Sequence, residues 1–484
     1  MVADLLIRAA RAVTGSMREA ERPLAIAVAG GQITAVEPLG ATSLAGRNVL
    51  ELDADVVLMP GLVDSHVHVC EPGNAEWEGF STATRAAAAG GITTLVDMPL
   101  DSVPTTVSAD ALTVKRDAAA GQCHADVAFW GGVVPGNDAE LEPMARAGVT
   151  GFKCFLADSG SPDFPPVTTG QLTAALAALA SLGLPLLVHA ESAEAAAGLE
   201  DAEIAGSTGS GPGRSYARYL AGHPRGLENL AIAQVIEAAR VTGGHAHIVH
   251  LSSSDAIAMI ASAQREGVTV TAETCPHYLT LAAEEIRDGD TAAKCCPPVR
   301  EASNRELLWA GLRAQTLSMI VSDHSPCTAE MKAIGTGDFG AAWGGISSLQ
   351  LGLPLIWTQA RSRGFGLEQV AAWMSTAPAR LAGLTSKGRL APGCDADFCV
   401  LAPDESFVAE PGQLHHKHPT TTPYAGRTLY GVVRATILRG QPVDPDRGFG
   451  DRPTGQHGRP AGRLLYRQPG SDSCTSGLRT PDRE

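Results

Sequence analysis

Short apolar stretches alternate along the chain with alanine-rich segments that have helical periodicity. Segments 169–182 and 305–314, for example, repeat apolar residues at the spacing of one helix face. Eight apolar stretches of strand length follow one another at 62–68, 92–98, 126–134, 150–157, 184–191, 247–253, 268–276 and 318–325. Eight strand–helix units over roughly 320 residues predict an α/β fold that closes as a (β/α)8 TIM-like barrel, and a doubly wound parallel sheet is the alternative.

Short strands are also expected at both ends of the chain, where polar turns separate apolar runs. The runs lie at 4–13, 24–38 and 49–61 and return at 388–404 and 428–443. We therefore predict one small β-sandwich built from residues 1–58 and 387–447, with residues 59–386 as the barrel. Residues 448–484 are rich in Gly, Pro and Arg and lack apolar periodicity, so we expect them to be disordered.

The composition narrows the class of protein. Hydrophobic residues make up 44 % and charged residues 18 %, which favours a folded core over a disordered chain. Lys and Arg number 37 against 52 Asp and Glu, so the formal charge is 37 − 52 = −15. A chain this acidic is poorly suited to nucleic acid or to an anionic membrane surface, and we expect neither as a partner. No apolar run approaches the roughly 20 residues of a membrane span.

The ten cysteines indicate a reducing compartment. They lie between Cys70 and Cys474 and form no C-x-x-C pair, which is more typical of reduced thiols than of a disulfide framework or a zinc ribbon. Arginines interrupt the apolar N-terminal stretch, and no small-residue cleavage site follows it, so we expect no signal peptide. A cytoplasmic location follows as the prediction.

Ionisable residues recur where the predicted barrel strands end, which is the functional end of such barrels. His66 and His68 end the first strand, and side-chain alternation points both the same way, so they can reach one metal ion. Lys153 lies inside the otherwise apolar fourth strand, where a charged amine is costly. Its amine either reaches solvent along its own stem or is neutral and has captured carbon dioxide as a carbamate.

The later strands add three more candidates. His189 ends the fifth strand, His250 the sixth and Asp323 the eighth. Alternation separates His250 from His245 and His247, so we take His250 as a ligand and His247 as a supporting group. Any one of these residues alone would ordinarily be structural, but their joint occurrence at the ends of barrel strands indicates a functional site.

Several motifs together make a family resemblance specific, and they cover most of residues 1–445. They are PGLVDSHVHVCEPG at 60–73, GFKCF at 151–155, LVHAES at 187–192, IVHLSS at 248–253 and VSDHSPC at 321–327. The chain resembles the cyclic amidohydrolases, which comprise dihydroorotases, hydantoinases and allantoinases. EPGNAEWEGF at 71–80 and AAWGGISSLQ at 341–350 are most similar to the allantoinase branch.

The resemblance implies a hydrolase with two divalent metal ions in each subunit. Zinc is expected, and cobalt, manganese or iron would suit the same ligands. The implied ligands are His66, His68 and Asp323 for the more buried ion and His189 and His250 for the more exposed one, with carboxylated Lys153 as the bridge. A hydroxide between the ions would attack the ring carbonyl of a cyclic amide, with Asp323 as general base and then general acid.

Two departures from the family pattern narrow the substrate. Dihydroorotases of this type carry an arginine two residues after the H-x-H pair, and Cys70 stands there. Hydantoinases carry a tyrosine shortly after the bridging lysine, whereas Lys153 is followed by CFLAD. We therefore expect hydrolysis of allantoin to allantoate, in purine and ureide catabolism. The resemblance also implies substrate contacts from Cys296, Ser325, Gly344 and Gly345, for which a plain loop role is the alternative.

Other functions remain open at this stage. A hydantoinase- or dihydropyrimidinase-type activity is the first alternative, and a metal-free scaffold homologue is the second. A mononuclear deaminase on the same barrel lacks the bridging lysine, so Lys153 argues against it. The family also implies a homotetramer that acts on a small molecule.

Overall fold

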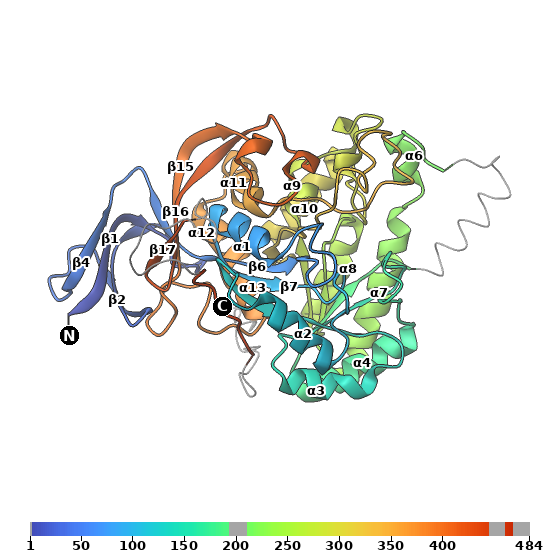
Figure 1. Cartoon of the computed structure of the whole chain (residues 1–484), viewed down its shortest axis with the longest axis horizontal. Coiled ribbons are helices and arrows are strands. Elements are labelled where there is room, and N and C mark those ends of the chain that lie inside the picture. Colours follow the sequence, from blue (N-terminus) through green and yellow to red (C-terminus); the bar gives the residue numbers. More distant parts are fainter. Residues whose placement is uncertain (1, 193–210, 445–459, 468–484) are drawn as a thin grey trace.

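A barrel of strands and helices and a separate sheet domain make up the computed structural model, which describes residues 2–192, 211–444 and 460–467 (Figure 1). The sheet domain lies at one end of the long axis, and strands from both ends of the chain enter it. Within those ranges no helix has the length and apolar character needed to cross a membrane.

Eight parallel strands form the barrel. They are β6 Leu62–Val67, β7 Ile92–Asp97, β8 Asp126–Phe129 continued by β9 Gly131–Gly132, β10 Phe152–Phe155, β11 Leu186–His189, β12 Ala246–Ile248, β13 Val270–Thr274 and β14 Met319–Ile320. Pairing runs from β6 to β8 and from β9 to β14. A bridge between Val67 and His324 joins the first strand to the chain after the last, where the His68 N–H donates to the His324 carbonyl at 2.9 Å. The predicted barrel is confirmed, and the doubly wound sheet is wrong.

Helices lie on the outside of the barrel, between successive strands and after the last one. The longer ones are α1 Phe80–Ala89, α2 Ala109–Ala119, α4 Thr169–Leu182, α7 Arg225–Thr242, α8 Ile257–Arg265, α10 Ala302–Arg313 and α11 Gly352–Ser362, and the shorter ones are α3 Leu141–Arg146, α6 Tyr216–Ala221, α9 Pro276–Thr280, α12 Leu367–Ala371 and α13 Ala377–Leu381. Helix α4 has the bounds that its periodicity predicts. Thr168 and Gln171 form a capping box at its start, and Gly183 ends it in the left-handed region that glycine favours.

The sheet domain joins the two ends of the chain. Its strands are β1 Ala3–Ala12, β2 Arg22–Ala29, β3 Gln32–Pro38, β4 Gly46–Leu52, β5 Val57–Pro60, β15 Phe398–Val408, β16 Thr428–Leu438 and β17 Gln441–Val443. β5 pairs antiparallel with β15, so Leu58 lies opposite Val400 in a core separate from that of the barrel. As predicted, both ends contribute to one β domain, whose strands form a single eight-stranded sheet. The boundaries at 58, 386 and 447 stay predictions.

Residues 460–467 differ from the disorder expected of the C-terminal segment. The Val127 N–H of β8 donates to the Arg463 carbonyl at 2.9 Å, and the Leu465 N–H donates to the Val127 carbonyl at 2.7 Å. The buried guanidinium of Arg467 donates to the carbonyls of Thr150 and Gly183, each at 3.0 Å. Backbone pairing and one buried arginine hold this segment, and neither depends on apolar periodicity. The rest of 448–484 lies outside the described residues.

A buried ionic cluster connects the barrel to the sheet domain. Lys387 Nζ lies 2.6 Å from Asp126 at the start of β8, 2.7 Å from Asp397 and 2.9 Å from Asp395, both just before β15. Arg439 Nη1 also contacts Asp126, at 2.6 Å. Although burial opposes the charge, Asp397 and Asp126 hold the pKa of Lys387 above its ordinary value. The ammonium group thus occupies the centre of three carboxylates.

We predict that Lys387→Met lowers the free energy of unfolding by about 3–5 kcal/mol, because it leaves Asp126 and Asp397 buried with less compensation. Urea denaturation of the two proteins measures the difference. Arg434→Met is the control, since it breaks only an exposed ion pair with Glu405 and should cost about 1 kcal/mol or less. Equal losses in the two variants would show that the cluster does not stabilise the fold.

Candidate metal centre

The six predicted metal ligands line one cavity at the carboxyl ends of the barrel strands, and its volume is about 1110 Å³. His66 lies on β6, Lys153 on β10 and His189 at the end of β11. The other three, His68, His250 and Asp323, follow β6, β12 and β14. All six are buried. Cys296, Ser325 and Gly344 also line the cavity, whereas Gly345, which is in close contact with Ser325, is not part of the lining.

Three of these side chains form one cluster. Nε2 of His66 lies 3.1 Å from Oδ1 of Asp323, and Nε2 of His68 lies 3.8 Å from the same oxygen. Their potential ligand atoms all lie within 4.8 Å of one another. Two imidazoles and a carboxylate at this spacing are a donor set that zinc and similar divalent ions accept.

His189 and His250 form the second cluster. Nδ1 of His189 lies 2.9 Å from Nε2 of His250, and Nε2 of His189 lies 2.8 Å from Glu191. A neutral His189 that donates from Nε2 to Glu191 presents a lone pair at Nδ1. Nδ1 of His250 has no partner. Two ring nitrogens that face each other at this distance need either a proton or a cation between them.

The amine of Lys153 has no hydrogen-bond partner among the described residues and lies 4.8 Å from the centre of the Phe155 ring. Its side chain is buried. Burial lowers the pKa of Lys153 to about 8, although Asp323 and Glu273 act in the opposite direction. The first alternative from the sequence, a lysine that reaches solvent, is therefore wrong. The uncharged amine is the form that reacts with carbon dioxide, and the lowered pKa makes this form more accessible for Lys153.

Sequence reasoning did not assign the carboxylates that orient the imidazoles. Nδ1 of His66 donates to Glu273 at 2.6 Å, and Nδ1 of His68 donates to Asp101 at 2.7 Å. Glu273 also accepts from His247 at 2.9 Å, which makes His247 a supporting group. These bonds leave Nε2 of His66 and of His68 free for a ligand. A glutamate near the end of a predicted barrel strand was the available signal for Glu273 in the sequence, because the other candidates were identified by the same position.

Burial keeps the imidazoles in their ligand form. It lowers the pKa of His66, against the attraction of Asp323 and Glu273, and it lowers the pKa of His250 well below the ordinary value. Only a neutral imidazole coordinates a metal ion. Burial opposes ionisation of Glu273, but the imidazoles of His66 and His247 hold its pKa below the usual range. The site therefore combines neutral nitrogen donors with negative oxygen donors, as a divalent cation requires.

Backbone strain occurs at the same place. His250 has φ 37°, Asp323 has φ 46° and Asp101 has φ 63°, all in the left-handed region that non-glycine residues rarely adopt. Such conformations persist only where the surrounding structure enforces them, and they are commonly found at functional sites. The strands end here with side chains turned towards the cavity, at a cost in backbone energy.

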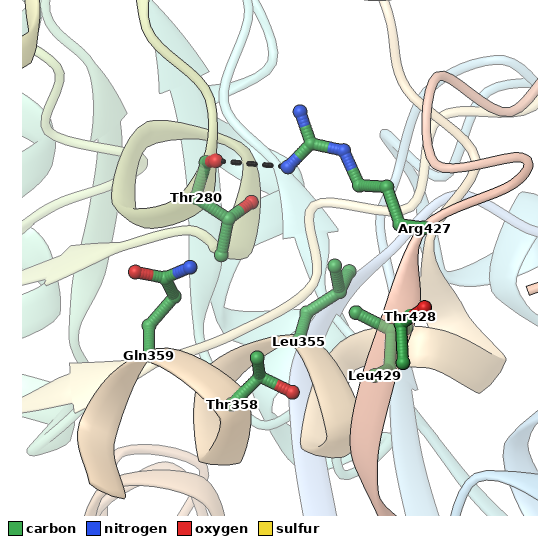
Figure 2. Close-up of a pocket in the computed structure, with 7 residues that line it drawn as sticks. All are labelled: Thr280, Leu355, Thr358, Gln359, Arg427, Thr428 and Leu429. Carbon is green, nitrogen blue, oxygen red and sulfur yellow. Dashed lines mark hydrogen bonds between the residues drawn. The ribbon is translucent and has the colours of Figure 1, made fainter. Parts of the chain in front are cut away.

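A second, smaller cavity of about 230 Å³ lies apart from this site (Figure 2). It lies between α9, α11 and β16, and Arg427 Nη1 donates across it to the Thr280 carbonyl at 3.1 Å. Its lining comprises Thr280, Leu355, Thr358, Gln359, Arg427, Thr428 and Leu429. No His, Cys, Asp or Glu is among these seven, so of these two cavities only the larger has the donors for metal chemistry.

Known proteins resemble the chain in sequence and in fold. The model of the "Amidohydrolase family" matches residues 57–443. An allantoinase from Streptomyces avermitilis is 51 % identical over 466 residues, which cover 96 % of this chain and 99 % of that protein. An allantoinase from Arabidopsis thaliana is 47 % identical over 80 % of this chain and 78 % of its own. The L-hydantoinase (dihydropyrimidinase) from Arthrobacter aurescens superposes with a TM-score of 0.86 at 28 % identity, over 96 % of this chain and all of its own.

We predict that Glu273→Gln weakens divalent metal binding about 10- to 100-fold, because His66 then loses the carboxylate that orients its ring. Chelator competition followed by elemental analysis measures the change. Glu306→Gln is the control, since it removes a carboxylate from an exposed ion pair with Arg363. Wild-type affinity in Glu273→Gln would exclude an orienting role for this carboxylate.

Proposed function

The chain belongs to the amidohydrolase family, and we propose that it hydrolyses a ring amide of allantoin to give allantoate. One observation carries the proposal. Four imidazoles, a carboxylate and an unpaired lysine amine converge in one cavity of a chain that is 51 % identical to an allantoinase over nearly its whole length.

We infer that the cavity holds two divalent cations, with zinc as the first expectation. His66, His68 and Asp323 would hold one and His189 and His250 the other, and Lys153, as a carbamate, would contact both. The fit rests on the unpaired Nζ of Lys153 and on the facing nitrogens of His189 and His250. A carbamate turns a costly buried cation into an anion beside two cations. Bound divalent cations supply a water of lowered pKa and polarise a carbonyl.

Asp323 is the proton carrier in this proposal. Its carboxylate lies against both the His66 and His68 nitrogens and also accepts from the Ser325 hydroxyl at 3.4 Å. It would accept the proton of the attacking water and pass it to the ring nitrogen as the C–N bond breaks. Water adds across one amide bond, so the products are a neutral ureido nitrogen and a carboxylic acid, which releases one proton to solvent and becomes the carboxylate. His66 and His68 hold Asp323 in place.

The lining of the cavity favours a neutral ring. No guanidinium lies among the described residues that form it, so the carboxylate of a dihydroorotate would have no bidentate partner. No tyrosine lies among them either, which argues against an ordinary hydantoinase. We propose that Cys296, Ser325 and Gly344 contact the ring. The homotetramer and the cytoplasmic location stay predictions from the resemblance.

We predict that Lys153→Ala loses both bound metal and activity, because the two clusters then lack their shared ligand. A short-chain carboxylic acid added to the variant should restore part of both, since its carboxylate can take the place of the carbamate. Metal content and turnover are measured with and without the acid. Full activity in the untreated variant would remove Lys153 from the site.

A substrate panel tests the proposed activity itself. We expect the zinc-loaded protein to open allantoin at least about tenfold faster than hydantoin, dihydrouracil or dihydroorotate, because a few hydrogen bonds to the ureido arm are worth that factor. Asp323→Asn is the matched control, and loss of the general base should lower turnover by about 10²- to 10⁴-fold. Faster opening of hydantoin or dihydrouracil would instead support the hydantoinase alternative.

A further inference from the structure

We propose that Lys332 is a positioning residue for the substrate, and that its ammonium group fixes two loop segments, 294–296 and 342–345, as one wall of the cavity. The inference rests on the proposed function, because it takes this wall as the surface that the ring contacts. Lys332 itself does not line the cavity and would act through the backbone of these segments.

The ammonium group has three partners, and all are backbone carbonyls. Lys332 is 1 % exposed, and its Nζ donates to the carbonyl of Lys294 at 2.7 Å, to that of Trp343 at 3.0 Å and to that of Gly345. A protonated lysine has three hydrogens to donate. Each hydrogen therefore has one acceptor, and the acceptors come from both segments.

The two segments meet at the cavity. Lys294, Cys296, Trp343 and Gly344 line it. Nζ of Lys294 donates to the Ala342 carbonyl at 2.6 Å, which adds a second connection. A Cβ on Gly344 would come within 3.0 Å of Cys296 Sγ, so the segments are already in close contact. Displacement of either segment by an ångström would change the shape of this wall.

Lys332 also sets the direction of peptide groups in the wall. The Trp343 carbonyl and the Gly344 N–H belong to one planar peptide group and point in opposite directions. Because the Trp343 carbonyl accepts a hydrogen bond from Lys332, the Gly344 N–H is directed away from Lys332. The same bond therefore determines where a donor of the wall points. A ring that presents carbonyl and N–H groups needs such fixed partners.

The number of hydrogen bonds that Lys332 donates to the wall depends on pH, because it depends on the charge state of the amine. Burial lowers the pKa of Lys332 to about 8, while the thiols of Cys327, Cys295 and Cys296 act to raise it and Lys294 acts to lower it. Lys332 in turn acts to lower the pKa of the buried His277. A neutral lysine has only two hydrogens, which leaves one of the three carbonyls without a donor. We expect the wall to loosen as pH rises through about 8.

Steady-state kinetics of metal-loaded Lys332→Met test the proposal. KM should rise at least about tenfold, with kcat within about threefold, because the wall binds ground state and transition state alike. Lys387→Met is the matched control, since it removes an equally buried lysine at the opposite end of the barrel and should leave KM unchanged. Lys332→Gln, which retains two donor hydrogens, should give a smaller increase and replaces Lys332→Met if that variant does not fold.

The pH profile provides a readout that simple loss of stability would not change. KM of the wild-type protein should rise between about pH 7 and about pH 9, because Lys332 loses its proton there. Lys332→Arg keeps its charge over this range, so its KM should stay level. An unchanged KM in Lys332→Met, or a wild-type KM that does not vary with pH, would overturn the proposal.

Binding measurements separate this inference from the proposed activity. The Kd of allantoin, determined by calorimetry on metal-loaded proteins that also carry Asp323→Asn to suppress turnover, should show the same ratio with and without Lys332→Met as KM does. Binding without turnover in the wild type would contradict the proposed activity and still decide the role of Lys332. Equal Kd values in the two proteins would refute that role even if allantoin is hydrolysed.

Discussion

A buried imidazole can serve as a ligand only if it is neutral and its lone pair faces the cavity, and the rest of this site depends on that condition. Burial supplies the first requirement, because it lowers the pKa of His66 and His250. Carboxylates that bind the other nitrogen of each ring supply the second. Glu273 accepts a hydrogen bond from Nδ1 of His66, and Glu191 accepts one from Nε2 of His189. Burial and these carboxylates thus direct the nitrogen donors into one cavity.

Buried lysines have different surroundings at the two ends of the barrel. At the amino end, Lys387 lies among three carboxylates, so the charges compensate each other and join the barrel to the sheet domain. At the carboxyl end, Nζ of Lys153 has no hydrogen-bond partner among the described residues and lies over the Phe155 ring, and acidic side chains outnumber lysines in the cavity lining. An excess of negative side chains suits a site that binds divalent cations, because the cations compensate the buried negative charge. Lys332 differs from both lysines, because its ammonium group has hydrogen-bond partners but all of them are uncharged backbone carbonyls.

Hydrophobic patterning predicted the eight strand–helix units of the barrel, and the tertiary structure excluded the doubly wound sheet that the same pattern allowed. Strand β6 spans Leu62–Val67 against a predicted 62–68, and α4 coincides with its prediction. These elements are decided locally, by the alternation of strand side chains and the periodicity of one helix face. Segment 460–467 was missed because its place beside β8 depends on backbone pairing and on one buried arginine. The amino-acid composition of a segment does not indicate contacts of this kind.

By itself, the sequence determined which strands end in histidine, lysine or aspartate, and alternation along each strand gave the side on which those residues lie. Tertiary structure alone decided which groups meet across the barrel. Glu273 and His66 are 207 positions apart and approach to 2.6 Å only because β13 and β6 belong to one closed ring. Lys332 reaches carbonyls 11 and 13 positions ahead of it and one 38 positions before it only because two loop segments pack together at the cavity. Alternation is a property of neighbours along one strand, whereas the partners of a buried charge are set by the packing of the whole ring.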